Sequence, residues 1–101
     1  MVVRFAWDEE KSEVNLRERG FDFEFASLVF AGLTLEREDA RRDYGERRVV
    51  AVGVADGIHL AVVYTDRRIG RSAIERRIIS ARRASRKERD AYEAAIQAQS
   101  A

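Results

Sequence analysis

Three runs rich in valine and isoleucine follow one another in the second half of this chain, and they constrain its fold most strongly. They are Arg47 to Val54, Ile58 to Thr65 and Ile74 to Ala81. Residues branched at Cβ favour strands, and the pair Asp56-Gly57 between the first two runs is typical of a tight hairpin turn. The chain is therefore expected to build an antiparallel sheet, which needs helices to cover an apolar face.

The first part of the chain predicts a strand and a helix. Val2 to Phe5 is a short apolar run typical of a strand, and Glu9 to Arg19 is expected to be helical. Asp8 stands where its carboxylate can accept hydrogen bonds from the unpaired N–H groups of the first turn, and Gly20 is a typical helix stop.

Two more helices are expected. Phe23 to Phe30 follows Asp22 as a cap and has apolar residues at helical spacing. Near the C-terminus, Ser85-Arg86-Lys87-Glu88 has the spacing of a capping box, which starts a helix from Arg86 to about Gln97.

Two polar segments are predicted as loops. Leu33 to Gly45 is weakly patterned apart from a short strand at Leu33 to Leu35, and Asp66 to Ala73 is expected to be a mobile basic loop. The expected fold is one α+β domain over residues 1–101. Two N-terminal helices and a C-terminal helix pack on a twisted, mainly antiparallel sheet.

The composition excludes several classes of site. The 101 residues include no cysteine and one histidine, so a disulfide framework, a thiolate nucleophile and a cysteine-based zinc site are excluded. We therefore expect no metal and no cofactor. No apolar run approaches the roughly 20 residues that a bilayer requires, and the first residues lack a secretory signal. A cytoplasmic protein without membrane contact is expected.

Charge is distributed unevenly along the chain. Arg67 to Arg89 holds nine arginines and one lysine against two acids, whereas Asp8 to Glu46 holds twelve acids against six basic residues. Clustered cations gain by displacing counterions from phosphates, and arginine can grip a phosphate through two hydrogen bonds. Phosphate or carboxylate recognition is the leading interpretation. A solvated charged face, or two poles that pair within a dimer, is the alternative.

Several phrases, taken in order, resemble the BrnT family of bacterial toxins over about residues 4 to 92. These are Phe5-x-Trp7-Asp8-x-x-Lys11-x-x-x-Asn15, Gly20-Phe21-Asp22-Phe23-Glu24-x-Ala26, Tyr44-Gly45-Glu46-Arg47, Val62-Val63-Tyr64-Thr65, and Arg77-Ile78-Ile79-Ser80-Ala81-Arg82-Arg83-Ala84-Ser85 with Glu88 and Tyr92. The chain departs from the family in having Glu18-Arg19-Gly20 where Lys-His-Gly is frequent, and Tyr64 where histidine is frequent. Any role of those histidines does not carry over.

The resemblance implies a small ribonuclease with a RelE-like fold, the toxin of a type II toxin–antitoxin pair, which inhibits translation and growth. It further implies an RNA substrate and a BrnA-like antitoxin of ribbon-helix-helix type. The resemblance also implies that the complex binds its own promoter DNA through the antitoxin.

RNA cleavage without a metal needs proton transfer and positive charge at the phosphate. The one histidine, His59, lies beside the hairpin turn and is expected to be structural or exposed, so arginine, lysine and tyrosine must carry catalysis. The candidate catalytic residues are Lys11, Tyr64, Arg77, Arg82 and Arg83, and the candidate RNA-binding residues are Asn15, Arg67, Arg68, Arg71, Arg76, Arg86 and Lys87. Side chains alternate along a strand, which predicts that Arg77 and Arg83 share one face with Ile79 and Ala81, and that Arg76 and Arg82 share the other.

Each candidate has an alternative role in the fold. Lys11 and Asn15 are four residues apart on one side of a helix and form either an RNA-facing patch or local pairs. Tyr64 can act as a base only if nearby arginines depress its pKa, and buried packing is the alternative. Glu88 could serve as a base, but its position in the capping box already explains it. Tyr92 is expected to be a packing residue with a hydroxyl to satisfy. For the whole protein, a basic module that binds nucleic acid without cutting it, or a protein-interaction module, remains open.

Overall fold

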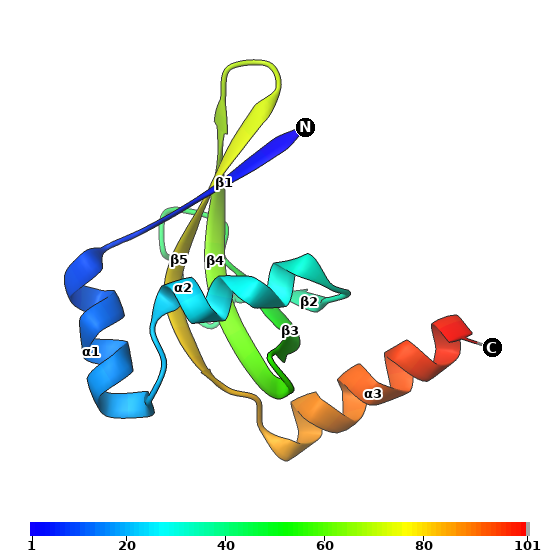
Figure 1. Cartoon of the computed structure of the whole chain (residues 1–101). Coiled ribbons are helices and arrows are strands. Elements are labelled where there is room, and N and C mark those ends of the chain that lie inside the picture. The colour runs from blue at the N-terminus through cyan, green and yellow to red at the C-terminus, as the bar shows by residue number, and fades with distance from the viewer. Residues whose placement is uncertain (101) are drawn as a thin grey trace.

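The computed structural model describes residues 1–100, which form a mixed five-stranded sheet with helices (Figure 1). The elements are β1 (Val2–Trp7), α1 (Glu9–Arg19), α2 (Phe23–Ala26), the 3-10 helix η1 (Ser27–Ala31), β2 (Leu35–Glu38), β3 (Val49–Ala55), β4 (Ile58–Ile69), β5 (Ala73–Arg83) and α3 (Arg86–Ser100). The strand order is β1-β5-β4-β3-β2. The α+β class is confirmed. The sheet is mixed, because β1 runs parallel to β5 while the other pairings are antiparallel.

The caps predicted for α1 and α3 are present. Asp8 Oδ1 accepts from the backbone N–H groups of Glu10 (2.9 Å) and Lys11 (3.3 Å), and Gly20 ends α1 in the left-handed region at φ 88°. At α3, Ser85 Oγ accepts from the Glu88 N–H (3.2 Å) while the Glu88 carboxylate accepts from the Ser85 N–H (2.8 Å). These reciprocal bonds satisfy donors that a helix start leaves unpaired. α3 continues to Ser100, past the end expected near Gln97. Within residues 1–100, none of the helices is apolar and long enough to cross a membrane.

Two expectations for residues 23–45 were wrong in detail. The helix predicted over Phe23 to Phe30 is α-helical only to Ala26 and then tightens into η1. The segment predicted as a loop contains β2, which begins at Leu35, where the short strand was expected to end. Every residue of β2 is exposed, so hydrogen bonding to β3 rather than burial defines this outer strand, and no apolar alternation marks it in the sequence.

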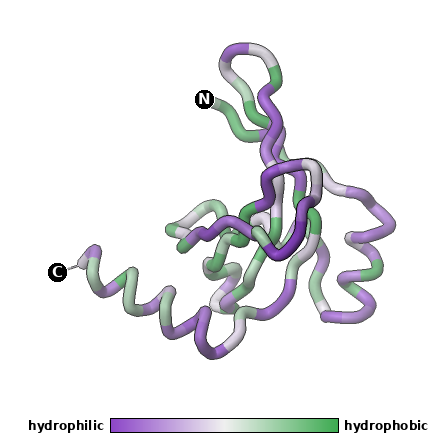
Figure 2. The backbone as a smooth tube through the Cα atoms, turned by 180° about the vertical axis from the view of Figure 1, so that it is seen from behind, coloured by the Kyte–Doolittle hydropathy of each residue, from purple (hydrophilic) through white to green (hydrophobic). Residues whose placement is uncertain are grey.

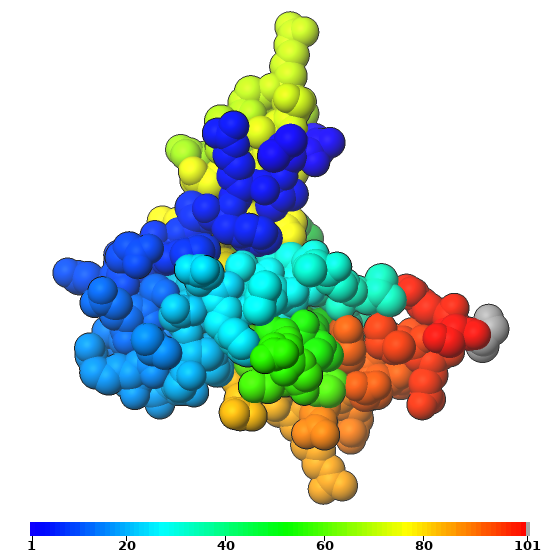
Figure 3. Space-filling view, viewed as in Figure 1, coloured from blue at the N-terminus to red at the C-terminus, as the bar shows by residue number. Residues whose placement is uncertain are grey.

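The basic loop predicted over Asp66 to Ala73 is also wrong. Asp66–Ile69 extends β4 and Ala73 already belongs to β5, so only residues 70–72 form the turn. Opposite charges face each other across these strands, with Arg76 bound to Asp66 and Arg67 bound to Glu75. Such cross-strand pairs stabilise a polar hairpin that has no apolar pattern. The hairpin projects from the body of the molecule (Figure 3).

Two apolar clusters lie on opposite faces of the sheet. On the first, which we call the α1–α2 face, Phe21, Phe23, Ala26 and Val29 pack on sheet residues that include Leu60, Val62, Ile78 and Ala81. The contact is close at Gly53, where an added Cβ would lie 2.9 Å from Val29 Cβ. On the second, the α3 face, Tyr92 packs with Val50, Val52, Ala61 and Val63. The Tyr92 hydroxyl donates to Leu33 O (2.9 Å), which confirms its packing role.

A β-bulge in β5 changes which arginines share a face. Val63 lies opposite Ser80 but Tyr64 lies opposite Ile78, so Ile79 is an extra residue without a partner in β4. An extra residue reverses the alternation beyond it. The predicted grouping was therefore wrong. Arg77 shares the α3 face with Arg82, while Arg76 and Arg83 lie on the α1–α2 face.

Candidate functional site

The α3 face carries a groove of about 410 Å³ that is lined by four arginines. We call it the arginine groove. Arg19 comes from the end of α1, Arg37 from β2, Arg41 from the connection between β2 and β3, and Arg82 from β5. The remaining lining residues are Glu38, Asp39, Ala40, Val50, Val63 and Ser80. Seen from behind, residues 39–48 cross in front of the sheet as a largely hydrophilic segment (Figure 2).

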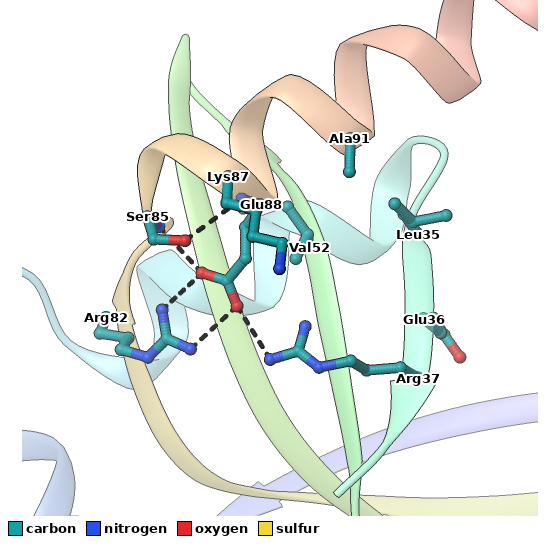
Figure 4. Close-up of a pocket in the computed structure, with 9 residues that line it drawn as sticks. All are labelled: Leu35, Glu36, Arg37, Val52, Arg82, Ser85, Lys87, Glu88 and Ala91. Atoms are coloured by element: carbon teal, nitrogen blue, oxygen red, sulfur yellow. Dashed lines mark hydrogen bonds and ion pairs between the residues drawn. The ribbon is translucent and has the colours of Figure 1, made fainter.

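Arg82 is held by a carboxylate from the first turn of α3. Its Nη1 and Nη2 donate to Glu88 Oε1 and Oε2 at 2.7 and 2.9 Å, and Arg37 Nη2 donates to Glu88 Oε2 at 3.0 Å (Figure 4). The Arg82 guanidinium, and with smaller effect the Ser85 N–H and Arg37, hold the pKa of Glu88 well below its usual range. Glu88 therefore stays charged and is a poor proton acceptor near neutral pH. Its role is to fix two guanidinium groups, while the Arg82 side chain remains 41% exposed.

Arg19 reaches the groove across the edge of the sheet. β1 pairs with β5 only as far as Ile78, so the Ala81 carbonyl lies on a free edge of β5. Arg19 Nη1 donates to this carbonyl at 2.8 Å. In the sequence, Arg19 stands out as the end of a predicted helix and as a departure from a family pattern, not as a site residue. Its contact joins residues 62 positions apart, and no local signal predicts it.

Arg41 is fixed by a buried carboxylate. Its Nε and Nη2 donate to Asp39 Oδ1 and Oδ2 at 2.8 and 2.9 Å, and the Tyr44 hydroxyl lies 3.4 Å from Oδ2. Bonding to Arg41, against the opposing effect of burial, lowers the pKa of Asp39 to about 2. Arg37 and Arg41 were both missed, because they belong to a segment predicted as a loop.

The pair predicted on α1 separates into two roles. Asn15 is buried, and its Nδ2 donates to Phe21 O at 2.8 Å, so its amide stabilises the turn after α1. Lys11 is exposed and lines a shallow hollow of about 330 Å³ together with Arg19 and Ser80. Both of those residues also line the arginine groove, so Lys11 stands beside it.

The side chains of Tyr64 and Arg76 lie on the α1–α2 face and make their contacts there. Tyr64 is buried and its hydroxyl donates to Glu36 Oε1 at 2.7 Å. Burial, and then this bond, raise the pKa of Tyr64 against the opposing effect of the Arg76 charge. The condition for Tyr64 to act as a base is therefore not met, and it has the alternative role of buried packing. Arg76 donates to both oxygens of Asp66 at 2.9 Å, and its guanidinium lies 4.1 Å from the centre of the Tyr64 ring and 4.8 Å from that of Phe30.

The remaining candidates lie outside the groove. Arg77 lies on the α3 face, as the groove does, and its Nη2 is 3.6 Å from Glu46 Oε2. Arg83 is exposed on the α1–α2 face. Arg67, Arg68 and Arg71 are exposed on the projecting hairpin, and Arg86 and Lys87 are exposed at the start of α3. His59 lies with Nε2 2.6 Å from Glu93 Oε1 and its ring against Tyr92, which fits the structural role expected for it. Residues 1–100 contain no group of three or more histidine, cysteine, aspartate or glutamate side chains arranged to hold a metal ion.

The geometry can be set beside known proteins. No individual curated protein matches this chain. Residues 7–88, however, match the family described as "Ribonuclease toxin, BrnT, of type II toxin-antitoxin system", and this span includes all four arginines of the groove. Because the match covers most of the chain, the protein belongs to the BrnT family of ribonuclease toxins of type II toxin–antitoxin systems.

Proposed function

We propose that the chain is an endoribonuclease of RelE-like fold that cleaves cellular RNA in the cytoplasm without a metal, and so inhibits translation and growth. We further propose that the arginine groove holds the scissile phosphate. One observation carries this proposal: arginines from four separate segments of the chain line a single groove of the α3 face. Convergent fixed cations suit a phosphate whose charge grows during the reaction.

In the proposed reaction, the 2′-oxygen of the substrate forms a bond to phosphorus while the bond from phosphorus to the 5′-oxygen breaks. The proton of the 2′-hydroxyl leaves to water. Arg82 has the planar fork that can bind two phosphate oxygens, and Arg19, Arg37 and Arg41 add positive charge around it. Fixed by Glu88, Ala81 and Asp39, these groups need little reorganisation when the substrate binds.

Proton transfer to the leaving 5′-oxygen is assigned to Lys11. An ammonium group is a proton donor, and Lys11 lies in the hollow that shares Arg19 and Ser80 with the groove. Glu88 and Asp39 do not suit the role, because their lowered pKa values keep them ionised. Tyr64 does not suit it either, because it lies on the opposite face.

The remaining exposed cations of the α3 face and of the hairpin mark a path for the RNA strand. Arg77 and Arg67 line one hollow beside the hairpin. Arg86 and Lys87 are exposed in the first turn of α3, which also supplies Glu88 to Arg82. Cations along a strand add affinity that depends on salt. Arg83 lies on the opposite face and is left out of this path.

We also propose that the antitoxin is a BrnA-like protein of ribbon-helix-helix type. It would cover the groove with acids or an amphipathic helix and bind promoter DNA on behalf of the complex. Four arginines around one groove suit an acidic partner surface.

The test incubates purified protein with RNA, with and without a chelator, beside Arg82→Ala and a control, Arg17→Ala. Arg17 is exposed on α1 and lines no part of the groove, so both variants lose one positive charge. We expect the wild-type protein and Arg17→Ala to cut RNA in the chelator, and Arg82→Ala to fail. Cleavage that a chelator abolishes and added metal restores would contradict the metal-free reaction. Equal cleavage by Arg82→Ala would remove the groove from it.

A second candidate is a module that binds RNA without cutting it. It is favoured because Glu88 and Asp39, the carboxylates that hold the groove arginines, have lowered pKa values and are poor proton acceptors, and because Tyr64 lies on the opposite face. Salt-dependent RNA binding by a folded protein that leaves the RNA intact would establish this candidate instead. If RNA did not bind at any ionic strength, only the protein-interaction function would remain.

A further inference from the structure

A second cavity adjoins the arginine groove. It has a volume of about 730 Å³ and lies between β2 and α3 on the α3 face. Leu35, Val52 and Ala91 form its apolar lining, and we call it the apolar pocket. Arg37 and Arg82 line both cavities, so the bridge that Glu88 makes between them is a shared wall (Figure 4).

The shared wall links the chemistry of the two cavities. On one side the guanidinium groups of Arg37 and Arg82 border the groove with its cluster of cations, and on the other they border aliphatic side chains. A nucleotide has the same division, with a charged phosphate joined to a base whose faces are apolar. A phosphate on Arg82 would therefore place an attached nucleoside at the mouth of the apolar pocket.

The pocket itself has the character of a base site. Its volume lies within the roughly 300–1,000 Å³ of small-molecule sites, which combine an apolar lining with few polar groups. Both oxygens of Glu36 already accept hydrogen bonds, from Tyr64 and Thr34, and both oxygens of Glu88 bind arginine. Lys87 is exposed at the rim, where its ammonium can donate to the polar edge of a base.

We propose that the apolar pocket is a nucleobase subsite. It takes the base of the RNA nucleotide that adjoins the scissile phosphate and so gives cleavage its sequence preference. This inference rests on the proposed function of the arginine groove. Because a base must leave its stack to enter, the substrate at this position is single-stranded.

The test fills the pocket from the surface of α3. Ala91 is exposed, so Ala91→Trp places a large ring in the pocket without disturbing the core. Ala98→Trp is the matched control, because Ala98 is exposed two turns further along α3 and lines no part of the pocket. Calorimetry measures binding of inorganic phosphate, ribose 5-phosphate and the four nucleoside 3′-monophosphates.

We expect at least one nucleotide to bind the wild-type protein about tenfold more tightly than ribose 5-phosphate, the gain typical of one stacked base. Ala91→Trp should lose this gain and keep its affinity for inorganic phosphate, while Ala98→Trp keeps both. Sequencing of cut ends should show a base preference next to the cleaved bond in the wild-type protein and in Ala98→Trp, but not in Ala91→Trp.

Two results would overturn the inference. One is equal affinity of the wild-type protein for ribose 5-phosphate and every nucleotide. The other is an Ala91→Trp variant that keeps the base preference but no longer binds the antitoxin, since the pocket would then belong to a protein partner. In both cases RNA is still cut. Failure of the proposed function gives a different result, because the wild-type protein then leaves RNA intact.

Discussion

Arg76 and Arg82 both project from β5 and both donate two hydrogen bonds to one carboxylate, yet their surroundings differ. On the α1–α2 face, Arg76 lies over the rings of Tyr64 and Phe30, and its side chain is 17% exposed. On the α3 face, the Arg82 side chain is 41% exposed and borders two cavities. A carboxylate partner therefore does not by itself bury an arginine. What covers the rest of the guanidinium decides how much of it remains open to a ligand.

The largest effect is expected for Arg82, the more exposed of the two arginines. Arg82→Ala should lower the rate of RNA cleavage about 100- to 1,000-fold, as loss of one fixed donor to a charged transition state does. The free energy of unfolding should fall by only about 1 kcal/mol, because Glu88 keeps Arg37 and the Ser85 N–H as partners. Single-turnover cleavage and urea unfolding measure the two quantities. A large loss of stability with normal cleavage would show that Arg82, like Arg76, stabilises the fold and does not take part in cleavage.

The alanine substitution of Arg76, on the α1–α2 face, should mainly lower stability and leave cleavage nearly unchanged. Arg76→Ala removes the partner of Asp66 and the contacts with two rings, so the free energy of unfolding should fall by about 2 kcal/mol. Cleavage per folded molecule should change less than about twofold, because the guanidinium lies on the face away from the groove. Urea unfolding and cleavage at a temperature where the variant is folded test both parts. If folded Arg76→Ala cut RNA much more slowly, the separation of the two faces would be wrong.

The bulge at Ile79 shows what the sequence could and could not predict. Capping residues and β-branched runs act locally, so Asp8, Ser85 and the strands that begin the hairpins were placed correctly. Arg82, predicted as a phosphate ligand, lines the arginine groove, but simple alternation grouped Arg77 with Arg83 and not with Arg82. One extra residue reverses the alternation, and nothing in Ile78-Ile79 marks which residue lacks a partner.

The rest of the groove depends on contacts between distant segments. Arg37 and Arg41 reach it because β2 pairs with β3, and Arg19 because β1 leaves the end of β5 uncovered. Tyr64 shows the converse, since its strand position was predicted but its burial against Glu36 depends on β2. Hydrophobic periodicity in the sequence describes one helix or strand at a time, so it cannot predict which strands pair with each other.

Acid should lower the stability of the fold by protonating Asp39 and Glu88, the carboxylates that hold the groove arginines. Asp39 and Glu88 have lowered pKa values in the folded chain, so each stabilises the fold fully above the unfolded values of about 4. This contribution is lost as the pH falls through the folded value, which is about 2 for Asp39. The melting temperature should therefore drop most steeply between about pH 4 and about pH 2. Asp39→Asn should start lower at pH 7 and drop less over that range, and an unchanged slope would contradict the ion pair.

The smallest effect tests the bulge itself. Arg77 is 52% exposed and 3.6 Å from Glu46, so Arg77→Ala should change the free energy of unfolding by less than about 0.5 kcal/mol. RNA affinity should fall only about two- to threefold at low salt, and the slope of log affinity against log salt should shrink by about 0.7, as for one lost phosphate contact on a single strand. Arg83→Ala is the matched control, because Arg83 is exposed on the opposite face and should leave that slope unchanged. Without the bulge the two arginines would share a face, and their variants would have the same salt dependence. Equal slopes for Arg77→Ala and Arg83→Ala would therefore contradict the proposed path of RNA along the α3 face.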